Sequence, residues 1–214
     1  MRLFPYLAVS LALASPLALA APAFAQVAAA PADAGDPAAR AFVEGLANDA
    51  FAVLRDKSMS RTASRSKVRS MLQRNVALED IGNRLIRRHR ATITPAQYTS
   101  YQSALPEFVL NAYADRLYDY SDASVKTLRT VGRGPMTDVY TRVTRPGAQP
   151  IDAIWQVKKT AAGKMVINNL TVSGINLSLT QEADFNSYIQ KNGFDALVTF
   201  LKTSNSKSAI SQTR

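Results

Sequence analysis

The spacing of apolar residues changes twice along this chain, and these changes restrict the fold that it can adopt. Between residues 36 and 121, apolar side chains recur every three or four positions, which is the spacing of helices with one buried face. Between residues 124 and 175 they alternate with polar side chains, as in half-buried strands, and from residue 176 the helical spacing returns. The sequence therefore predicts an α+β protein with an N-terminal helical part, a sheet and closing helices.

The helical part begins at Asp36-Pro37, a pair typical of a helix start. An aspartate side chain there accepts hydrogen bonds from free backbone amides, and proline is tolerated because the first turn does not use the amide hydrogen that it lacks. We predict the first three helices over residues 38–55, 62–73 and 79–90. A long fourth helix is predicted from Thr94, with many tyrosines and phenylalanines and a kink or break at Pro106.

The alternating region predicts four strands, which cover residues 124–131, 136–145, 151–159 and 165–175. Turn residues separate them, including Pro146-Gly147, so we expect a curved four-stranded antiparallel meander. Closing helices are predicted over residues 177–190, capped by Asn176, and 194–202. Helices that cover the concave face of such a sheet would enclose a cone-shaped apolar cavity.

The N-terminus has the composition of a secretory signal peptide. Arg2 precedes an apolar run, and Ala23-Phe24-Ala25 offers a small-residue cleavage site, so we expect cleavage near Ala25. The expected organisation is a signal peptide (1–25), a disordered leader (26–35), one domain (36–203) and a flexible tail (204–214). Within the domain we expect a helical part (36–121), a sheet (124–175) and closing helices (176–203). No later run is long and apolar enough to span a membrane, so the mature chain is expected to be exported without a span.

Residue types that perform catalysis or bind metals are scarce. The chain has no cysteine and one histidine, His89, whose neighbours Arg87, Arg88 and Arg90 include no carboxylate. A serine–histidine–aspartate site would need that histidine, and zinc would need a cluster of cysteines and histidines. We therefore expect no catalytic residues, no metal site and no cofactor.

Positive charge is concentrated in one stretch of the chain. Residues 55–90 contain eleven lysines and arginines against three acids, whereas the whole chain carries a net charge of +10. For an exported protein, anionic lipid headgroups or an acidic partner surface are better candidates than nucleic acid. The alternative is a solvated basic helix face.

Three stretches resemble one known family. They are Ala112-Tyr113-Ala114 with Leu117 on the long helix, Gly174-Ile175-Asn176-Leu177 at the end of the last strand, and Phe185 followed by "GFDAL" at Gly193–Leu197. Their order and spacing resemble the MlaC family, the periplasmic phospholipid-binding proteins of the Mla or toluene-tolerance pathway. The resemblance covers residues 42–202.

The resemblance implies an NTF2-like, cone-shaped fold and a periplasmic shuttle without enzymatic activity. Such a shuttle binds a glycerophospholipid and exchanges it between an outer-membrane lipoprotein complex and an inner-membrane ABC transporter, which maintains lipid asymmetry. The residues expected to line the lipid cavity are Phe108, Tyr113, Leu117, Val139, Val143, Trp155, Val157, Leu170 and Val172. Those expected to meet the headgroup or dock a partner are Arg84, Arg87, Arg88 and Arg90.

The sequence is also compatible with three other functional hypotheses. The same cavity could carry another hydrophobic lipid such as a hopanoid, or it could hold an enzyme active site built on a deep polar residue. A structural envelope protein with a filled core would have no cavity at all. The volume of the cavity and the chemistry of its lining separate these readings.

Overall fold

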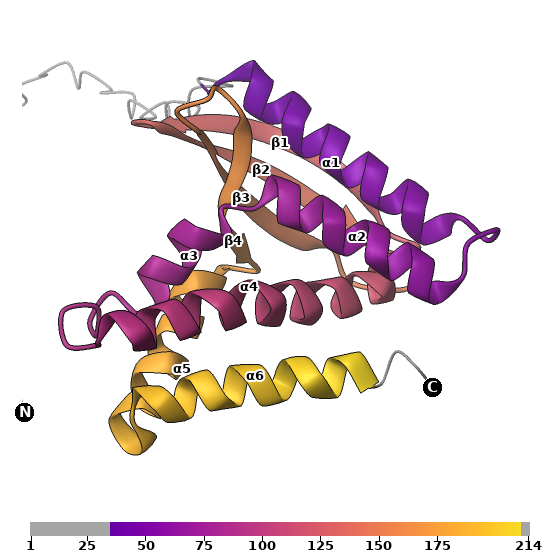
Figure 1. Ribbon diagram of the computed structural model, residues 1–214. Coiled ribbons are helices and arrows are strands. Elements are labelled where there is room, and N and C mark those ends of the chain that lie inside the picture. The colour runs from indigo at the N-terminus through magenta and orange to yellow at the C-terminus, as the bar shows by residue number, and fades with distance from the viewer. Residues whose placement is uncertain (1–34, 211–214) are drawn as a thin grey trace, which may run out of the picture. The chain divides into compact units, whose positions relative to one another are not determined.

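In the part of the chain that the structure describes, four α-helices and a short 3-10 helix precede the sheet and two α-helices follow it (Figure 1). The structure, a computed structural model, describes residues 35–210, which belong to one compact unit. Within these residues the helices are α1 (Pro37–Arg55), α2 (Arg61–Asn75), α3 (Leu78–Leu85), α4 (Pro95–Leu117), the short 3-10 helix η1 (Tyr118–Tyr120), α5 (Leu177–Asn192) and α6 (Phe194–Ile210). The predicted signal peptide and most of the predicted leader lie outside the described residues.

Side-chain caps fix where several helices begin. The Asp36 carboxylate accepts a hydrogen bond from the amide of Ala38, which confirms the predicted cap before Pro37. Thr94 and Gln97 form a reciprocal capping box at the start of α4. The side chain of Asn176 accepts from the amide of Leu179, so the predicted cap of the first closing helix is also confirmed.

The sheet is antiparallel and its strands follow one another in chain order. They are β1 (Ser124–Arg133), β2 (Met136–Thr144), β3 (Ile151–Lys159), β4 (Met165–Val172) and β5 (Ile175–Asn176). The prediction of four strands was therefore one strand short. Ser173 and Gly174 have φ angles of 50° and 80°, and two consecutive positive φ angles form a tight turn that reverses the chain. The predicted strand over 165–175 is thus a hairpin of β4 and β5.

One face of the sheet lies under α1 (Figure 1). The Cα atoms of Val139 and Trp155 are partners across β2 and β3, and Trp155 is in turn the partner of Leu170 on β4, so the three side chains share a face. Ala39 and Val43 of α1 form a buried cluster there with Val139 and Val157. Helix α1 therefore fills part of the hollow that the sheet would otherwise leave open.

Helix α4 continues through Pro106, so the predicted kink or break is wrong. Proline removes one backbone donor and ordinarily costs a helix interior about 3 kcal/mol. Here the turns on both sides are anchored, because Tyr101 and Leu105 before the proline and Leu110 after it are buried. Tertiary packing of these side chains outweighs the local penalty.

The third helix is shorter than predicted. Helix α3 ends at Leu85, and the chain up to residue 92 forms turns in place of the helix expected to residue 90. The amide of His89 donates to the carbonyl of Ile86 at 2.8 Å, a bond across three residues that is typical of turns.

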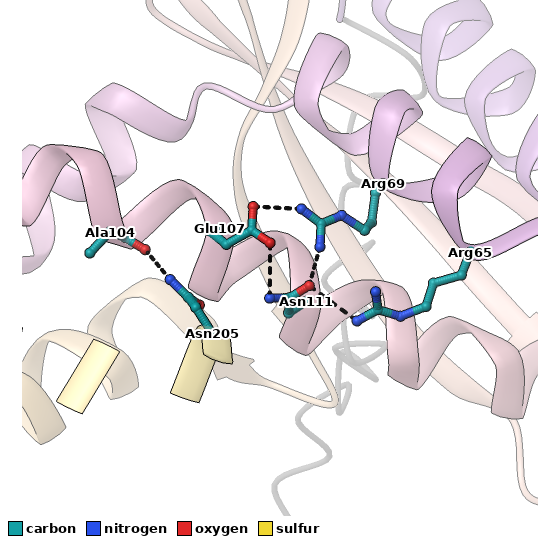
Figure 2. Close-up of polar contacts among 6 residues, drawn as sticks. All are labelled: Arg65, Arg69, Ala104, Glu107, Asn111 and Asn205. Carbon is teal, nitrogen blue, oxygen red and sulfur yellow. Dashed lines mark hydrogen bonds and ion pairs between the residues drawn. The ribbon is translucent and has the colours of Figure 1, made fainter. Parts of the chain in front are cut away.

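The last helix is longer than predicted, and this corrects part of the flexible tail expected over 204–214. Helix α6 runs to Ile210 beside α4, and residues 211–214 lie outside the described part (Figure 1). The polar composition after Thr203 concealed this extension. The Asn205 side-chain amide donates to the carbonyl of Ala104 on α4 at 2.9 Å (Figure 2), so polar residues here continue the packing.

Candidate functional site

An apolar cavity of about 250 Å³ lies between the helices and the sheet. Helices α1 to α5 and strands β3 and β4 all contribute to its wall. The apolar and aromatic lining residues are Leu46, Leu72, Val76, Leu78, Ile81, Leu85, Phe108, Val109, Leu110, Ala112, Tyr113, Trp155, Ile167, Leu170 and Leu177. The remaining lining residues are Arg116, Asn169, Ser178 and Gln181. Most of the lining is hydrocarbon, which suits an apolar ligand.

Helix α4 supplies one continuous stripe of this wall. Phe108, Ala112 and Arg116 are four residues apart and therefore lie on one face of the helix, with Val109 and Tyr113 beside them. At 1.5 Å per residue the stripe extends about 12 Å along the helix axis. It begins with apolar side chains and ends at a guanidinium.

The strands supply the opposite apolar surface. Trp155 and Leu170 are direct partners across β3 and β4 and both line the cavity. The indole nitrogen of Trp155 donates to the Thr141 hydroxyl at 2.9 Å, so its polar atom is satisfied. The ring is thereby held with its hydrocarbon available to the cavity.

Polar lining residues at the start of α5 are largely satisfied by one another. The Ser178 hydroxyl donates to the side-chain oxygen of Asn169 at 2.7 Å, and the amide of Asn169 donates to Asn176 at 3.1 Å. These groups hold the β4–β5 hairpin to α5. They are therefore not available as reactive groups facing the cavity.

The structure divides the nine predicted lining residues into two groups. Four line the cavity, namely Phe108, Tyr113, Trp155 and Leu170. Val139 and Val157 are instead buried in the core beneath α1, exposed by 0% and 1%. Leu117, Val143 and Val172, near the ends of α4, β2 and β4, do not belong to the lining.

Sequence reasoning missed the lining residues of the first three helices, such as Leu46, Leu72 and Ile81. Their signal was present as the apolar face of each helix. That signal is the same for a residue that packs against protein and for one that borders a cavity, so the sequence could not separate the two.

Arg84 is held within the fold. Its guanidinium donates to the carbonyl of Asn168 at 3.2 Å, to the side-chain oxygen of Asn168 at 3.0 Å and to the Ser178 hydroxyl at 3.3 Å. Burial lowers the pKa of Arg84, and the nearby Asp80 opposes that change. Arg84 therefore joins α3, β4 and α5, three elements of the cavity wall.

Replacing Arg84 with alanine is expected to lower the free energy of unfolding by about 2 kcal/mol, because Asn168 and Ser178 lose a charged donor. Urea unfolding followed by circular dichroism measures this change, and Arg74→Ala, an arginine outside the cavity wall, is the matched control. Equal stability of the two variants would contradict the bridging role of Arg84.

The other three predicted docking residues lie on the surface but have partners. Arg87 Nε donates to the Glu182 carboxylate at 2.7 Å, and Arg88 Nε lies 3.6 Å from the same oxygen. The Arg87 and Arg88 side chains remain 58% and 68% exposed. The Arg90 guanidinium carbon lies 3.8 Å from the ring centre of Tyr98. All three can still present positive charge to solvent.

A polar cluster fixes α2 against α4, two further walls of the cavity (Figure 2). Arg69 donates to the Glu107 carboxylate at 2.6 Å and also to the side-chain oxygen of Asn111. Arg65 donates to the same oxygen of Asn111 at 3.1 Å, and Asn111 donates to Glu107 at 3.3 Å. The bond from Arg69 holds the pKa of Glu107 below its usual range.

Glu107→Gln is expected to lower stability at pH 7 by less than about 1 kcal/mol, because the Glu107 side chain is 45% exposed and solvent screens the pair. The folded pKa is depressed, so this contribution is present above the unfolded pKa of about 4.3 and disappears as pH falls through the folded value. Urea unfolding at several pH values should show wild type and variant converging below about pH 4. A difference that persists there would contradict the ionic origin, and Glu79→Gln, at an exposed position of α3, is the control.

The side-chain contact of the single histidine is with an amide and not with a carboxylate or a nucleophile. His89 Nε2 lies 2.9 Å from the side-chain oxygen of Asn186 on α5. Among the side chains that the structure describes, no three His, Cys, Asp or Glu residues are grouped so that they could hold a metal ion. No helix within residues 35–210 is long and apolar enough to cross a membrane.

Comparisons with known proteins show the fold through a solved structure and the family through a family model. A phospholipid-binding protein from Ralstonia solanacearum, solved in complex with a phospholipid, is similar in structure with a TM-score of 0.68. The two sequences are 22% identical, and the match covers 80% of this chain and 98% of the other, which shows a shared fold. A search of curated protein sequences gives no match. Residues 44–203 match the family model described as MlaC protein, so this chain belongs to the MlaC family.

Proposed function

We propose that this protein is a periplasmic phospholipid carrier and not an enzyme. The observation that carries the proposal is the cavity itself, whose wall is mostly hydrocarbon although it is built from seven different helices and strands. Membership of the MlaC family and the phospholipid complex of the structural relative support the same ligand class. In this proposal the sheet and the helices over it form a cone-shaped, NTF2-like container for acyl tails.

The energetics favour binding without chemistry. Burial of hydrocarbon stabilises by about 0.8 kcal/mol per CH₂, so two sixteen-carbon tails represent roughly 25 kcal/mol before the costs of association. A carrier that buries the tails keeps part of this stabilisation while the lipid moves through water.

The proposal includes a cell compartment and partners. The N-terminal signal peptide, cleaved near Ala25, would deliver the protein to the periplasm. There it would exchange lipid between an outer-membrane lipoprotein complex and an inner-membrane ABC transporter. The exposed charge of Arg87, Arg88 and Arg90 would dock acidic surfaces or meet headgroups. Arg84 has a smaller share in docking because its donors are used within the fold.

A transfer assay tests the carrier role. Donor vesicles hold pyrene-labelled phosphatidylglycerol and acceptor vesicles hold unlabelled lipid, so transfer lowers excimer fluorescence. The mature protein is expected to accelerate transfer in proportion to its concentration. No acceleration, with a protein that circular dichroism shows to be folded, would contradict the carrier role.

A further inference from the structure

Arg116 is the one charged side chain among the described residues that line the cavity. It occupies the last turn of α4, at the end of the stripe that begins with Phe108. The residues before it on this face are apolar or aromatic, so the lining changes from hydrocarbon to cation along one helix. An anionic lipid changes in the matching way along its length, from hydrocarbon tails to a charged headgroup.

The guanidinium of Arg116 forms no hydrogen bond or ion pair with the side chains that the structure describes. Two other arginines of the cavity-forming helices have partners within the protein, since Arg69 is bound to Glu107 and Arg84 to Asn168. The negative end of the α4 dipole favours a cation at this position, but at an exposed site that effect is small. Its five N–H donors are therefore available to a ligand that enters the cavity.

Tyr113 lies one turn before Arg116 and lines the same cavity. Its hydroxyl also forms no hydrogen bond in the part of the chain that the structure describes. Burial raises the pKa of Tyr113, an effect that Arg116 partly opposes, so the hydroxyl stays protonated at neutral pH and can donate. Two donors without partners thus face the cavity from the same end of α4.

We propose that Arg116 and Tyr113 bind the phosphate of the carried lipid and that this contact selects phospholipids over neutral lipids. A guanidinium matches two phosphate oxygens with parallel donors, and the phenol can donate a further bond. The contact would place the headgroup at the C-terminal end of α4 and the tails toward Phe108 and Leu170. This inference rests on the proposed function, because it specifies the ligand of the same cavity.

The test compares two lipids that differ only in the headgroup. Delipidated protein is titrated with pyrene-labelled phosphatidylglycerol and with pyrene-labelled diacylglycerol of identical tails. Wild type is expected to bind the phospholipid more tightly than the diacylglycerol. In Arg116→Gln the ratio of the two dissociation constants should fall about tenfold, because that is the typical effect of losing one charged hydrogen bond. Tyr113→Phe should lose less, and Arg116→Lys should recover part of the preference because it keeps the charge.

The control is Arg74→Gln, which removes one positive charge at the end of α2, outside the cavity lining. It should keep the wild-type preference. An Arg116→Gln variant with an unchanged preference would overturn the inference and leave lipid binding intact. Wild type that binds neither lipid would overturn the proposed function itself. Added inorganic phosphate should not displace the lipid; displacement would show a site for free phosphate instead.

Discussion

Replacing Leu170 with tryptophan is expected to weaken phospholipid binding by about fivefold or more and so to lower the lipid bound per protein, because an overpacking cost of about 1–3 kcal/mol corresponds to a factor of about 5 to 160 in the dissociation constant. Leu170 lines the cavity from β4 and is the direct partner of Trp155. A second indole beside the first would occupy the space that acyl carbons need. Organic extraction and phosphate analysis of the purified variant measures the bound lipid.

The matched control is Leu128→Trp on β1. Leu128 is 43% exposed and lies outside the cavity lining, so this variant should retain wild-type lipid. Both variants should show the far-ultraviolet circular dichroism of the wild type. Full lipid content in folded Leu170→Trp protein would mean that the tails occupy another part of the molecule.

Replacing Tyr101 with alanine is expected to lower the free energy of unfolding by about 3–5 kcal/mol. Tyr101 is 0% exposed in the cluster formed by α3, α4, α5 and α6. Its ring lies 5.8 Å from that of Phe194, and its hydroxyl donates to the carbonyl of Gly82 at 2.9 Å. The loss is a large share of the stability of a typical domain, so the variant should unfold at a much lower urea concentration.

Tyr101→Phe separates the two contributions of this side chain. It keeps the ring and removes only the hydroxyl, so the expected loss is about 1 kcal/mol for one neutral hydrogen bond. Urea midpoints of both variants, measured on delipidated protein, give the comparison. A loss below about 1 kcal/mol in Tyr101→Ala would contradict the central place of this ring in the core.

Much of the fold was predictable because its causes are local. The change from helical to alternating spacing located the sheet, and Asp36 and Asn176 marked two helix starts through their own side chains. Pairing of successive strands followed from the short turns between them. These features depend on residues within a few positions of one another.

Features that depend on distant residues were not predictable in this way. Pro106 stays helical because Leu105 and Leu110 are buried by other helices, and α6 extends past Thr203 because Asn205 bonds to α4. Both outcomes oppose the local signal. The sequence did not indicate the chain reversal at Ser173-Gly174 for a different reason. Serine rarely adopts a positive φ angle, but Ser173 has one in this turn.

The site shows the same division. Val139, Trp155 and Leu170 were all predicted to line the cavity, and their register shows that they share one face of the sheet. It could not tell that α1 covers Val139 while Trp155 and Leu170 border the cavity. The difference between core and cavity depends on how far a helix reaches across the sheet, which is a property of the whole fold.

The most direct test of the lipid-carrier account is to purify the mature protein from a bacterial periplasm and identify its organic extract by mass spectrometry. The account predicts phospholipid in stoichiometric amount, bound within the cavity between α4 and β4. A hopanoid would retain a carrier but contradict the phosphate contact at Arg116. A folded protein that carries no lipid would contradict the account.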